Sequence, residues 1–488
     1  MSNSSLLIIA VGGVAALLLL ILKGKVQPFV ALMVVSIGVA LAAGVHAADL
    51  VKTIEDGMGS TLGHIATIIA LGAMVGRIIE LSGGAHAFAH ALIEKFGTRR
   101  TALALTVAGF ILGIPVFFEV GLIILMPIAS GVARAARKPL LVYALPMGSA
   151  MLTVHAFLPP HPGPVAAIEA IGASQGLVLL MGIPIAAAVT LLGYLLSRRL
   201  TRREYPMDPA VYAEVYGDPG TAEDTPAPAE TTGSVAPEGH GTAVLTKPAV
   251  PGVLTKPAVS GTDVRPPSFG MVLTLIVLPI LLILLGTIGQ NTLAADSVLR
   301  SVLTVVGAPM VALLIDLGLC AYFLGARRWW DRARIAEVMG SALPPVAAVI
   351  LVAGAGGVFG KVLVASGIGN AVADVLERTG LPILLLAFLT SLALRAAQGS
   401  ATVALITTAG ILTPLLDRAD LSAGHLSLVA LAMGAGALAL SHVNDAGFWM
   451  FTRLAGLDVA TGLRTWTVQT TAMGLMGFAF TAALWPLV

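Results

Sequence analysis

The sequence predicts an all-α polytopic membrane protein built from two repeats of inverted topology. Of its 488 residues, 57% are hydrophobic and only 11% are charged, with a mean hydropathy of +0.94. Soluble globular proteins carry about 25% charged residues. Apolar stretches of about 20 residues recur, the length that crosses a ~30 Å hydrocarbon core. They are longer than the ~10-residue alternating strands of membrane barrels, so they favour helices.

A polar segment divides the chain into two apolar halves of similar size. Residues 201–267 are rich in Pro, Thr, Ala, Gly and Glu, and "LTKPAV" occurs there twice, at 245–250 and 254–259. Such a segment has too little apolar surface to fold by itself. We therefore expect an N-terminal transmembrane repeat at 1–200, a disordered cytoplasmic linker at 201–267, and a C-terminal repeat at 268–488.

The two halves also resemble each other. Three small residues recur at one constant offset, and "LVYALPMGSAMLTVH" (141–155) matches "LVALAMGAGALALSH" (428–442) with a slip of one residue. The recurring residues are Gly76, Ser82 and Gly83 in the first half and Gly360, Ser366 and Gly367 in the second. Because the features keep their order, we interpret them as an internal repeat.

Membrane spans are placed by hydropathy and by the Lys/Arg clusters, which favour the cytoplasmic side. In the first half the expected spans are 5–22, 27–46, 61–81, 140–157 and 176–197. In the second half they are 269–289, 297–324, 341–365, 426–443 and 466–487. The first segment lacks a basic stretch before its apolar run, so we expect a span and not a cleaved leader.

A re-entrant hairpin is expected in each half, at 101–133 and at 381–416. The first lies between two basic clusters, so it must enter and leave on the cytoplasmic side. The second is flanked by segments without positive excess and opens outward, which inverts the second repeat. The N-terminus is then outside. Inverted repeats with broken helices are the usual build of secondary transporters, whose sites lie near the midplane.

Polar residues within the membrane are costly, so they mark candidate sites. Glu119 lies at the expected tip of the first hairpin, in "GIPVFFEVG" (113–121), where it could carry a proton. The alternative is a carboxylate that pairs with an arginine or caps a helix.

The second hairpin contains "LRAAQGSATVA" (394–404). Arg395 could pair with a carboxylate. Gln398, Ser400 and Thr402 could bind hydroxyls, and Gly399 would let backbone amides approach a ligand. The alternative is a hairpin whose polar groups satisfy its own backbone.

Prolines break the helix in "HAFLPPHPGP" (155–164), and His155 and His161 flank that break. An ordinary surface loop between spans is the alternative. The repeat argues against a loop, because this stretch corresponds in position to residues 441–449.

The stretch "SHVNDAGFW" (441–449) follows a strongly apolar run directly. Ser441, His442, Asn444 and Asp445 supply donors, acceptors and a titratable pair. A helix cap would account for one of them only. We therefore expect a discontinuous helix whose break faces the hairpins.

These stretches, together with "GAMVGRIIELSGGA", resemble the gluconate permease (GntP) family of proton symporters. The resemblance covers nearly the whole chain outside 201–267. It implies uptake of gluconate or a similar sugar acid with protons across the bacterial inner membrane. Some relatives carry other hydroxylated carboxylates or D-serine. The long linker departs from compact relatives.

The expected function is therefore proton symport of an aldonate, with no catalytic residue, cofactor or metal. Glu119 or Asp445 would carry the proton, with the histidines as alternates. A sodium-coupled carboxylate transporter of the same architecture is the main alternative, and an intramembrane metal enzyme using His155, His161, His442 and Asp445 is a remote one. The net charge of +2 gives no argument for nucleic acid. Homo-oligomerisation stays open.

Overall fold

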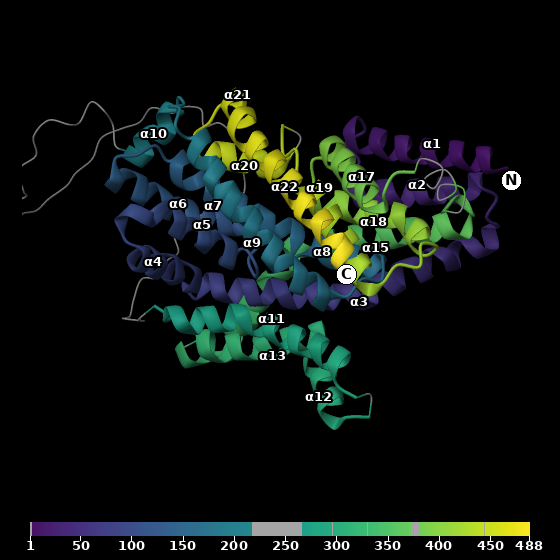
Figure 1. The fold of residues 1–488 in the computed structure, drawn as a ribbon, viewed down its shortest axis with the longest axis horizontal. Coiled ribbons are helices and arrows are strands. Elements are labelled where there is room, and N and C mark those ends of the chain that lie inside the picture. Colours follow the sequence, from purple (N-terminus) through teal and green to yellow (C-terminus); the bar gives the residue numbers. More distant parts are fainter. Residues whose placement is uncertain are drawn as a thin grey trace, which may run out of the picture.

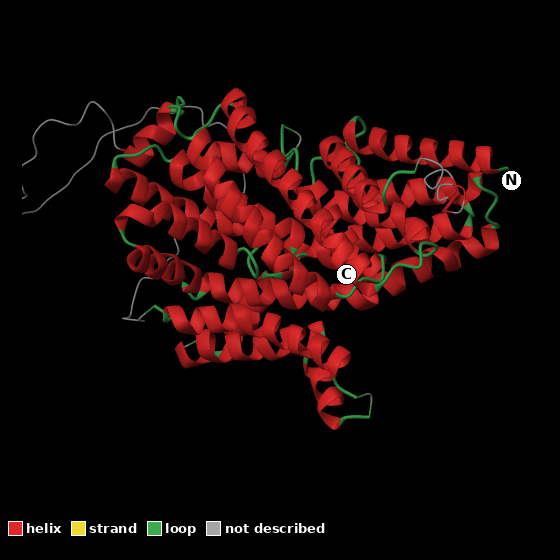
Figure 2. Cartoon of the chain, viewed as in Figure 1, coloured by secondary structure: helices red, strands yellow, loops and turns green. Residues whose placement is uncertain are grey.

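A computed structural model describes residues 2–216, 266–294, 296–328, 330–369, 371, 374, 380–443 and 445–488. Every regular element in these ranges is helical (Figure 2). Within them, nine helices are long and apolar enough to cross a membrane. The predicted all-α, multi-span class is confirmed.

The helices of the first half precede residue 217. They are α1 (Asn3–Leu22), α2 (Pro28–Ala42), α3 (Ala47–Leu81), α4 (Gly84–Phe96), α5 (Thr101–Leu112), α6 (Phe118–Ala136), α7 (Leu141–Phe157), α8 (Pro162–Ala170), α9 (Gln175–Leu200) and α10 (Pro209–Tyr216).

The described helices of the second half follow residue 265. Its helices are α11 (Phe269–Thr292), α12 (Val298–Val306), α13 (Pro309–Cys320), α14 (Arg332–Ser341), α15 (Leu343–Ala365), α17 (Ile383–Gln398), α18 (Ala401–Leu416), α19 (Ala423–Leu438), α20 (Ala446–Leu454), α21 (Val459–Gly462) and α22 (Val468–Leu484).

Two expected spans differ from the structure. The third span begins at Ala47 instead of 61, because the polar residues 47–60 continue the helix. The span expected at 297–324 is two helices, with α12 ending at Val306 and α13 starting at Pro309. Proline fits the first turn of a helix but not its interior, so it separates the two.

The expected linker is ordered at its start. Residues 209–216 form α10, and the Tyr216 hydroxyl donates to the Lys138 carbonyl at 2.8 Å. The Asp208 amide donates to the Gly456 carbonyl at 2.8 Å. The prediction of disorder is therefore wrong for residues 209–216, and residues 217–265 lie outside the described part of the chain.

The two halves meet along α3 and α15, which pack at close range. A Cβ on Gly57 would lie 2.7 Å from Val358 Cα, and one on Gly357 would lie 2.6 Å from the Gly57 carbonyl oxygen. Small residues allow such approach between membrane helices, where packing replaces the hydrophobic effect as the driving force.

Contacts between the halves are reciprocal. Helix α2 packs on α15 and α13 packs on α3, while α18 packs on α8 and α6 packs on α20. Within each half, α5 packs on α7 and α17 packs on α19. Each hairpin therefore supports the broken helix of the opposite half.

The ends of α3 and α15 have the same local geometry. Ser82 donates to the carbonyl three residues earlier at 3.0 Å and accepts from the amide two residues later at 3.3 Å. Ser366 makes the same two hydrogen bonds at 3.3 and 3.4 Å. Gly83 and Gly367 follow with φ of 75° and 72°. A positive φ favours glycine, so these matched positions share a structural cause.

The molecule is elongated in this view (Figure 1). Helices α5 and α6 lie toward its left end, α17 and α18 toward its right end, and α22 runs between them. Helices α11 and α13 run along the lower edge beside α3. The two hairpins thus approach the centre from opposite ends.

Candidate functional site

Four short segments interrupt the helical structure near the centre of the molecule. Two are the turns of the hairpins, and two are the breaks between α7 and α8 and between α19 and α20. The interruptions lie at 113–117, 158–161, 399–400 and 439–445. Prolines occupy the first two, Gly399 takes a φ of 80° at the third, and Leu440 takes a φ of 53° at the fourth. The predicted break at "SHVNDAGFW" is confirmed, with α19 ending at Leu438 and α20 starting at Ala446.

A cavity of about 270 Å³ lies among these breaks. Three helices begin at its wall, namely α6, α18 and α20. It is lined by Phe118, Glu119, Leu152, His155, Arg395, Gln398, Gly399, Ser400, Ala401, Thr402, Asp445, Ala446 and Gly447. Helix N-termini carry partial positive charge and unpaired amides, so their convergence favours an anion.

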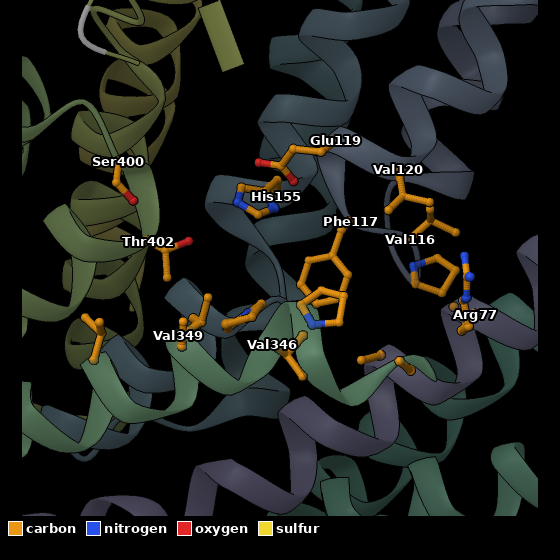
Figure 3. Close-up of a pocket in the computed structure, with 18 of the residues that line it drawn as sticks. Arg77, Val116, Phe117, Glu119, Val120, His155, Val346, Val349, Ser400 and Thr402 are labelled. Carbon is orange, nitrogen blue, oxygen red and sulfur yellow. The ribbon is translucent and has the colours of Figure 1, made fainter. Parts of the chain in front are cut away.

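A larger cavity of about 570 Å³ adjoins the first. Both are lined by Glu119, His155, Ser400 and Thr402, which therefore form the wall between them. Figure 3 shows these four side chains around the larger cavity, with Phe117 between them and Arg77. We call the smaller space the central cavity and the larger one the vestibule.

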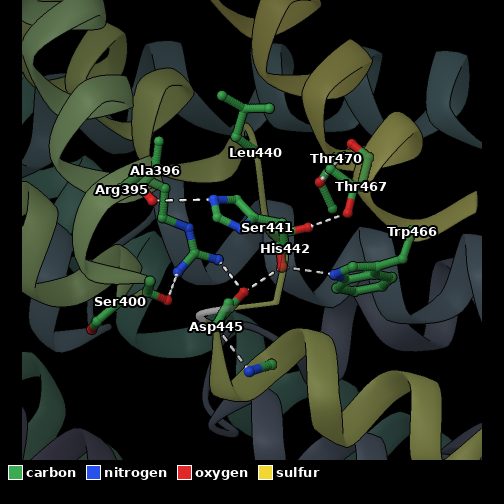
Figure 4. Close-up of polar contacts among 12 residues, drawn as sticks. Arg395, Ala396, Ser400, Leu440, Ser441, His442, Asp445, Trp466, Thr467 and Thr470 are labelled. Atoms are coloured by element: carbon green, nitrogen blue, oxygen red, sulfur yellow. Dashed lines mark hydrogen bonds and ion pairs between the residues drawn. The ribbon is translucent and has the colours of Figure 1, made fainter. Parts of the chain in front are cut away.

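A buried ion pair anchors one side of the central cavity (Figure 4). Arg395 is 1% exposed and donates to the Asp445 carboxylate and to the Gly399 carbonyl. The Asp445 carboxylate also accepts from the Ser441 hydroxyl and, at 2.9 Å, from the Gly447 amide. Asp445 thereby caps α20 and joins the two breaks of the second half.

The interrupted segment after α19 is fixed by side chains of the helical turn Leu463–Thr467, which directly precedes α22. The Trp466 indole donates to Ser441 Oγ at 2.7 Å, and the Thr467 hydroxyl donates to the Ser441 carbonyl at 2.6 Å. His442 Nε2 lies 3.1 Å from the Ala396 carbonyl. These contacts satisfy backbone groups that the broken helix leaves free.

The histidines of the first half lie together. The rings of His155 and His161 have centroids 4.7 Å apart. His161 Nε2 is hydrogen-bonded to the Gly113 carbonyl and must carry the proton there, because a carbonyl only accepts. That bond ties the α7–α8 break to the first hairpin, while Nδ1 of His155 is buried with no hydrogen-bond partner in the described part of the chain.

Two further groups in the cavity walls are available to a ligand. Both the amide oxygen and the amide nitrogen of Gln398 are buried without a hydrogen-bond partner among the described residues. Glu119 lies in the first turn of α6, in the wall shared by both cavities, near the charges of Arg395 and Asp445. An unpaired buried polar group costs about 1–3 kcal/mol, which a bound hydroxyl would relieve.

The structure gathers most residues that the sequence singled out. Glu119, His155, Arg395, Gln398, Gly399, Ser400, Thr402 and Asp445 line the central cavity. Neither cavity is lined by His161, Ser441 or His442, for which the sequence predicted direct contact with the substrate. These three residues instead form hydrogen bonds that hold the helix breaks in place. Asn444 lies outside the described residues.

The sequence reasoning missed the vestibule. Arg77, Glu80 and Gln27 line it, and Arg77 pairs with Glu80 at 2.7 Å while donating to Ser341 at 3.1 Å. Arg77 belongs to the stretch "GRIIELSGG", whose charged residues within an apolar run were the available signal. No group of three His, Cys, Asp or Glu side chains suited to a metal occurs within the described residues.

Comparisons with known proteins cover the whole length. The chain is 45% identical to the inner membrane permease YgbN of Escherichia coli K12, over all of both chains. It is 36% identical to the gluconate permease of Bacillus licheniformis, over 98% of this chain and 99% of that one. It is 35% identical to the Gnt-II system L-idonate transporter of Escherichia coli K12, over 96% and 97%.

A solved structure shares the fold. The Alcanivorax borkumensis YdaH transporter matches with a TM-score of 0.57 and 15% identity, over 91% of each chain. The family model of GntP family permeases matches residues 4–234 and 250–488. The protein is therefore a membrane transporter and not an enzyme, and the chain belongs to the GntP family of permeases.

Proposed function

We propose that the chain imports gluconate or a closely related sugar acid by proton symport. The observation that carries the proposal is the central cavity, where three helix N-termini, one arginine and several hydroxyl and amide groups converge. Relatives at 35–36% identity are a gluconate permease and an L-idonate transporter. A sugar acid presents one carboxylate and a row of hydroxyls, which matches this set.

The substrate carboxylate would bind at the start of α18 and beside Arg395. Backbone amides at 401 and 402 begin that helix, and Arg395 Nε is buried without a partner among the residues that the structure describes. Arg395 already pairs with Asp445, so the guanidinium keeps a fixed orientation when substrate arrives. The hydroxyls would meet Gln398, Ser400 and Thr402.

Glu119 is the carboxylate best suited to carry the coupling proton. It lies between the vestibule and the central cavity, whereas Asp445 is occupied by Arg395, Ser441 and Gly447. A carboxylate that binds a proton when the site faces outside and releases it when the site faces inside would couple the proton gradient to substrate uptake.

We further propose that the halves are inverted repeats with re-entrant hairpins. The reciprocal contacts and the matched ends of α3 and α15 support this. With basic clusters inside, the N-terminus is outside, residues 201–267 are cytoplasmic, and the vestibule beside α14 opens inward.

Radiolabelled gluconate uptake into proteoliposomes tests the function. We expect accumulation with an inward proton gradient and no sodium. Accumulation that requires sodium would instead establish sodium coupling. Absence of uptake by folded protein would remove gluconate as substrate, and L-idonate, other hydroxy acids and D-serine would be tried next.

The role of Gln398 has its own test. Gln398→Ala should raise the KM for gluconate about tenfold or more, because the two hydrogen bonds that its amide can make are together worth about 2 kcal/mol and about 1.4 kcal/mol is a factor of ten. Gln290→Ala, at the exposed end of α11 and outside both cavities, is the matched control. Equal KM values for the two variants would contradict hydroxyl binding by Gln398.

A further inference from the structure

One carboxyl group inside the membrane remains unexplained by the site above. Asp316, in α13, is 0% exposed. Its Oδ2 lies 3.9 Å from the Cys320 thiol, a weak donor, and its Oδ1 has no partner among the described residues. Ionisable residues in membrane helices are costly and tend to mark proton or ion pathways.

Asp316 borders a small apolar space that we call the seam. The seam has a volume of about 20 Å³, room for roughly one water molecule. Its walls come from α3, α9, α11 and α13 and from the breaks at 113–117 and 158–161. Gln175 Oε1, also on the wall, is buried without a hydrogen-bond partner among the described residues.

Nothing described in the surrounding elements neutralises an ionised Asp316. On α3, Arg77 is paired with Glu80. His161 bonds the Gly113 carbonyl, and Arg300 of the α12 segment donates to the Leu293 carbonyl at 3.4 Å.

The remaining neighbours add no charge. Helix α11 contains no titratable residue, and α9 has only the phenol of Tyr194 before Arg198 at its far end. On α3, the side chain of His64 lies outside the described residues. An isolated carboxylate in this apolar seam would carry a large desolvation cost, which a bound proton would remove.

The linings of the seam and the vestibule share one residue. Pro115, in the turn of the first hairpin, lines both spaces. A Cβ on Gly76 would lie 2.1 Å from the Pro115 carbonyl oxygen, so the turn is held directly against α3. Displacement of this turn would open Asp316 to the water of the vestibule, and its return would close the seam again.

We propose that Asp316 is a second proton carrier of the transport cycle, distinct from Glu119. This inference rests on the proposed proton symport. A proton binds Oδ1 when the seam is open to one side and leaves when it is open to the other. One proton moving with a monovalent acid is electrically neutral. A second proton gives a net inward charge of one, so the membrane potential then drives uptake.

The test uses proteoliposomes with equal pH on both sides and a potassium diffusion potential, negative inside, set by valinomycin. The wild-type protein should accumulate gluconate under this potential. Asp316→Asn, which keeps the shape of the side chain, should lose that accumulation and fall to the level without potential. It should still accumulate under a pH gradient and should keep gluconate counterflow exchange.

Two further variants separate the carboxyl from packing. Asp316→Glu retains a titratable group and should restore the response to potential. Cys320→Ala removes the neighbouring thiol and leaves the carboxyl, so it should behave as the wild type. If Asp316→Asn lacks exchange, restoration of both activities by Asp316→Glu still supports the proposal, and failure of that rescue overturns it.

The outcomes also separate this inference from the proposed function. A wild type that responds to a pH gradient but not to potential overturns the second carrier and leaves proton symport intact. An Asp316→Asn protein that accumulates gluconate under potential like the wild type also overturns the second carrier and leaves proton symport intact. A wild type that ignores the pH gradient overturns proton symport itself.

Discussion

The buried pair of Arg395 and Asp445 gives the sharpest prediction about stability. Their side chains are 2% and 8% exposed, so the two charges lie outside bulk water. Removing one partner of a buried ion pair costs about 3–5 kcal/mol, because the other charge stays buried without compensation. We therefore expect Arg395→Gln and Asp445→Asn each to lower the free energy of unfolding by that amount.

The double variant distinguishes the loss of the ion pair from a general destabilisation of the fold. With both groups neutral, no charge is left buried alone, so the double variant should be less destabilised than the sum of the single variants. Coupling between contacting residues is typically about 0.5–3 kcal/mol. The assay is unfolding of purified protein in mixed micelles, without substrate, for the wild type and all three variants. Strict additivity would refute the reasoning.

Three other predictions follow from the same structure. Glu119→Gln should keep gluconate counterflow but lose proton-driven accumulation, and accumulation equal to the wild type would exclude Glu119 as the carrier. Gly76→Ala should lower the melting temperature, because a Cβ there overpacks the contact with Pro115 and overpacking costs about 1–3 kcal/mol. Gly63→Ala is the control. Its Cβ position has open space around it, so the melting temperature should be unchanged or raised. Ser441→Ala should destabilise by about 1–3 kcal/mol, as the Trp466 indole N–H loses its acceptor, and indole fluorescence should shift; an unchanged unfolding curve and emission would contradict that bond.

The conformation of the break after α19 shows where local sequence suffices. A polar group of four residues directly after an apolar helix predicted an interruption, and the helix ends at Leu438. The reason is local, since Ser, Asn and Asp favour caps and turns over helix interiors. The same holds for the prolines at 159 and 160, which end α7.

The partners of these residues depend on the tertiary structure. The sequence offered Arg395 as a substrate ligand and Asp445 as a proton carrier, but the fold pairs them with each other. Their separation of 50 positions along the chain carries no information about that contact. It arises because the second hairpin and the α19–α20 break meet at the same depth.

Apolar length and basic clusters determined the helical class and most of the spans, because hydropathy acts over a few neighbouring residues. They could not show that Gln398 and Asp316 have buried atoms without a partner among the described residues, or that Pro115 lines both the vestibule and the seam. Those features exist only when helices from both halves pack together, since a hydrogen-bond partner or a cavity wall is supplied by residues distant in the chain.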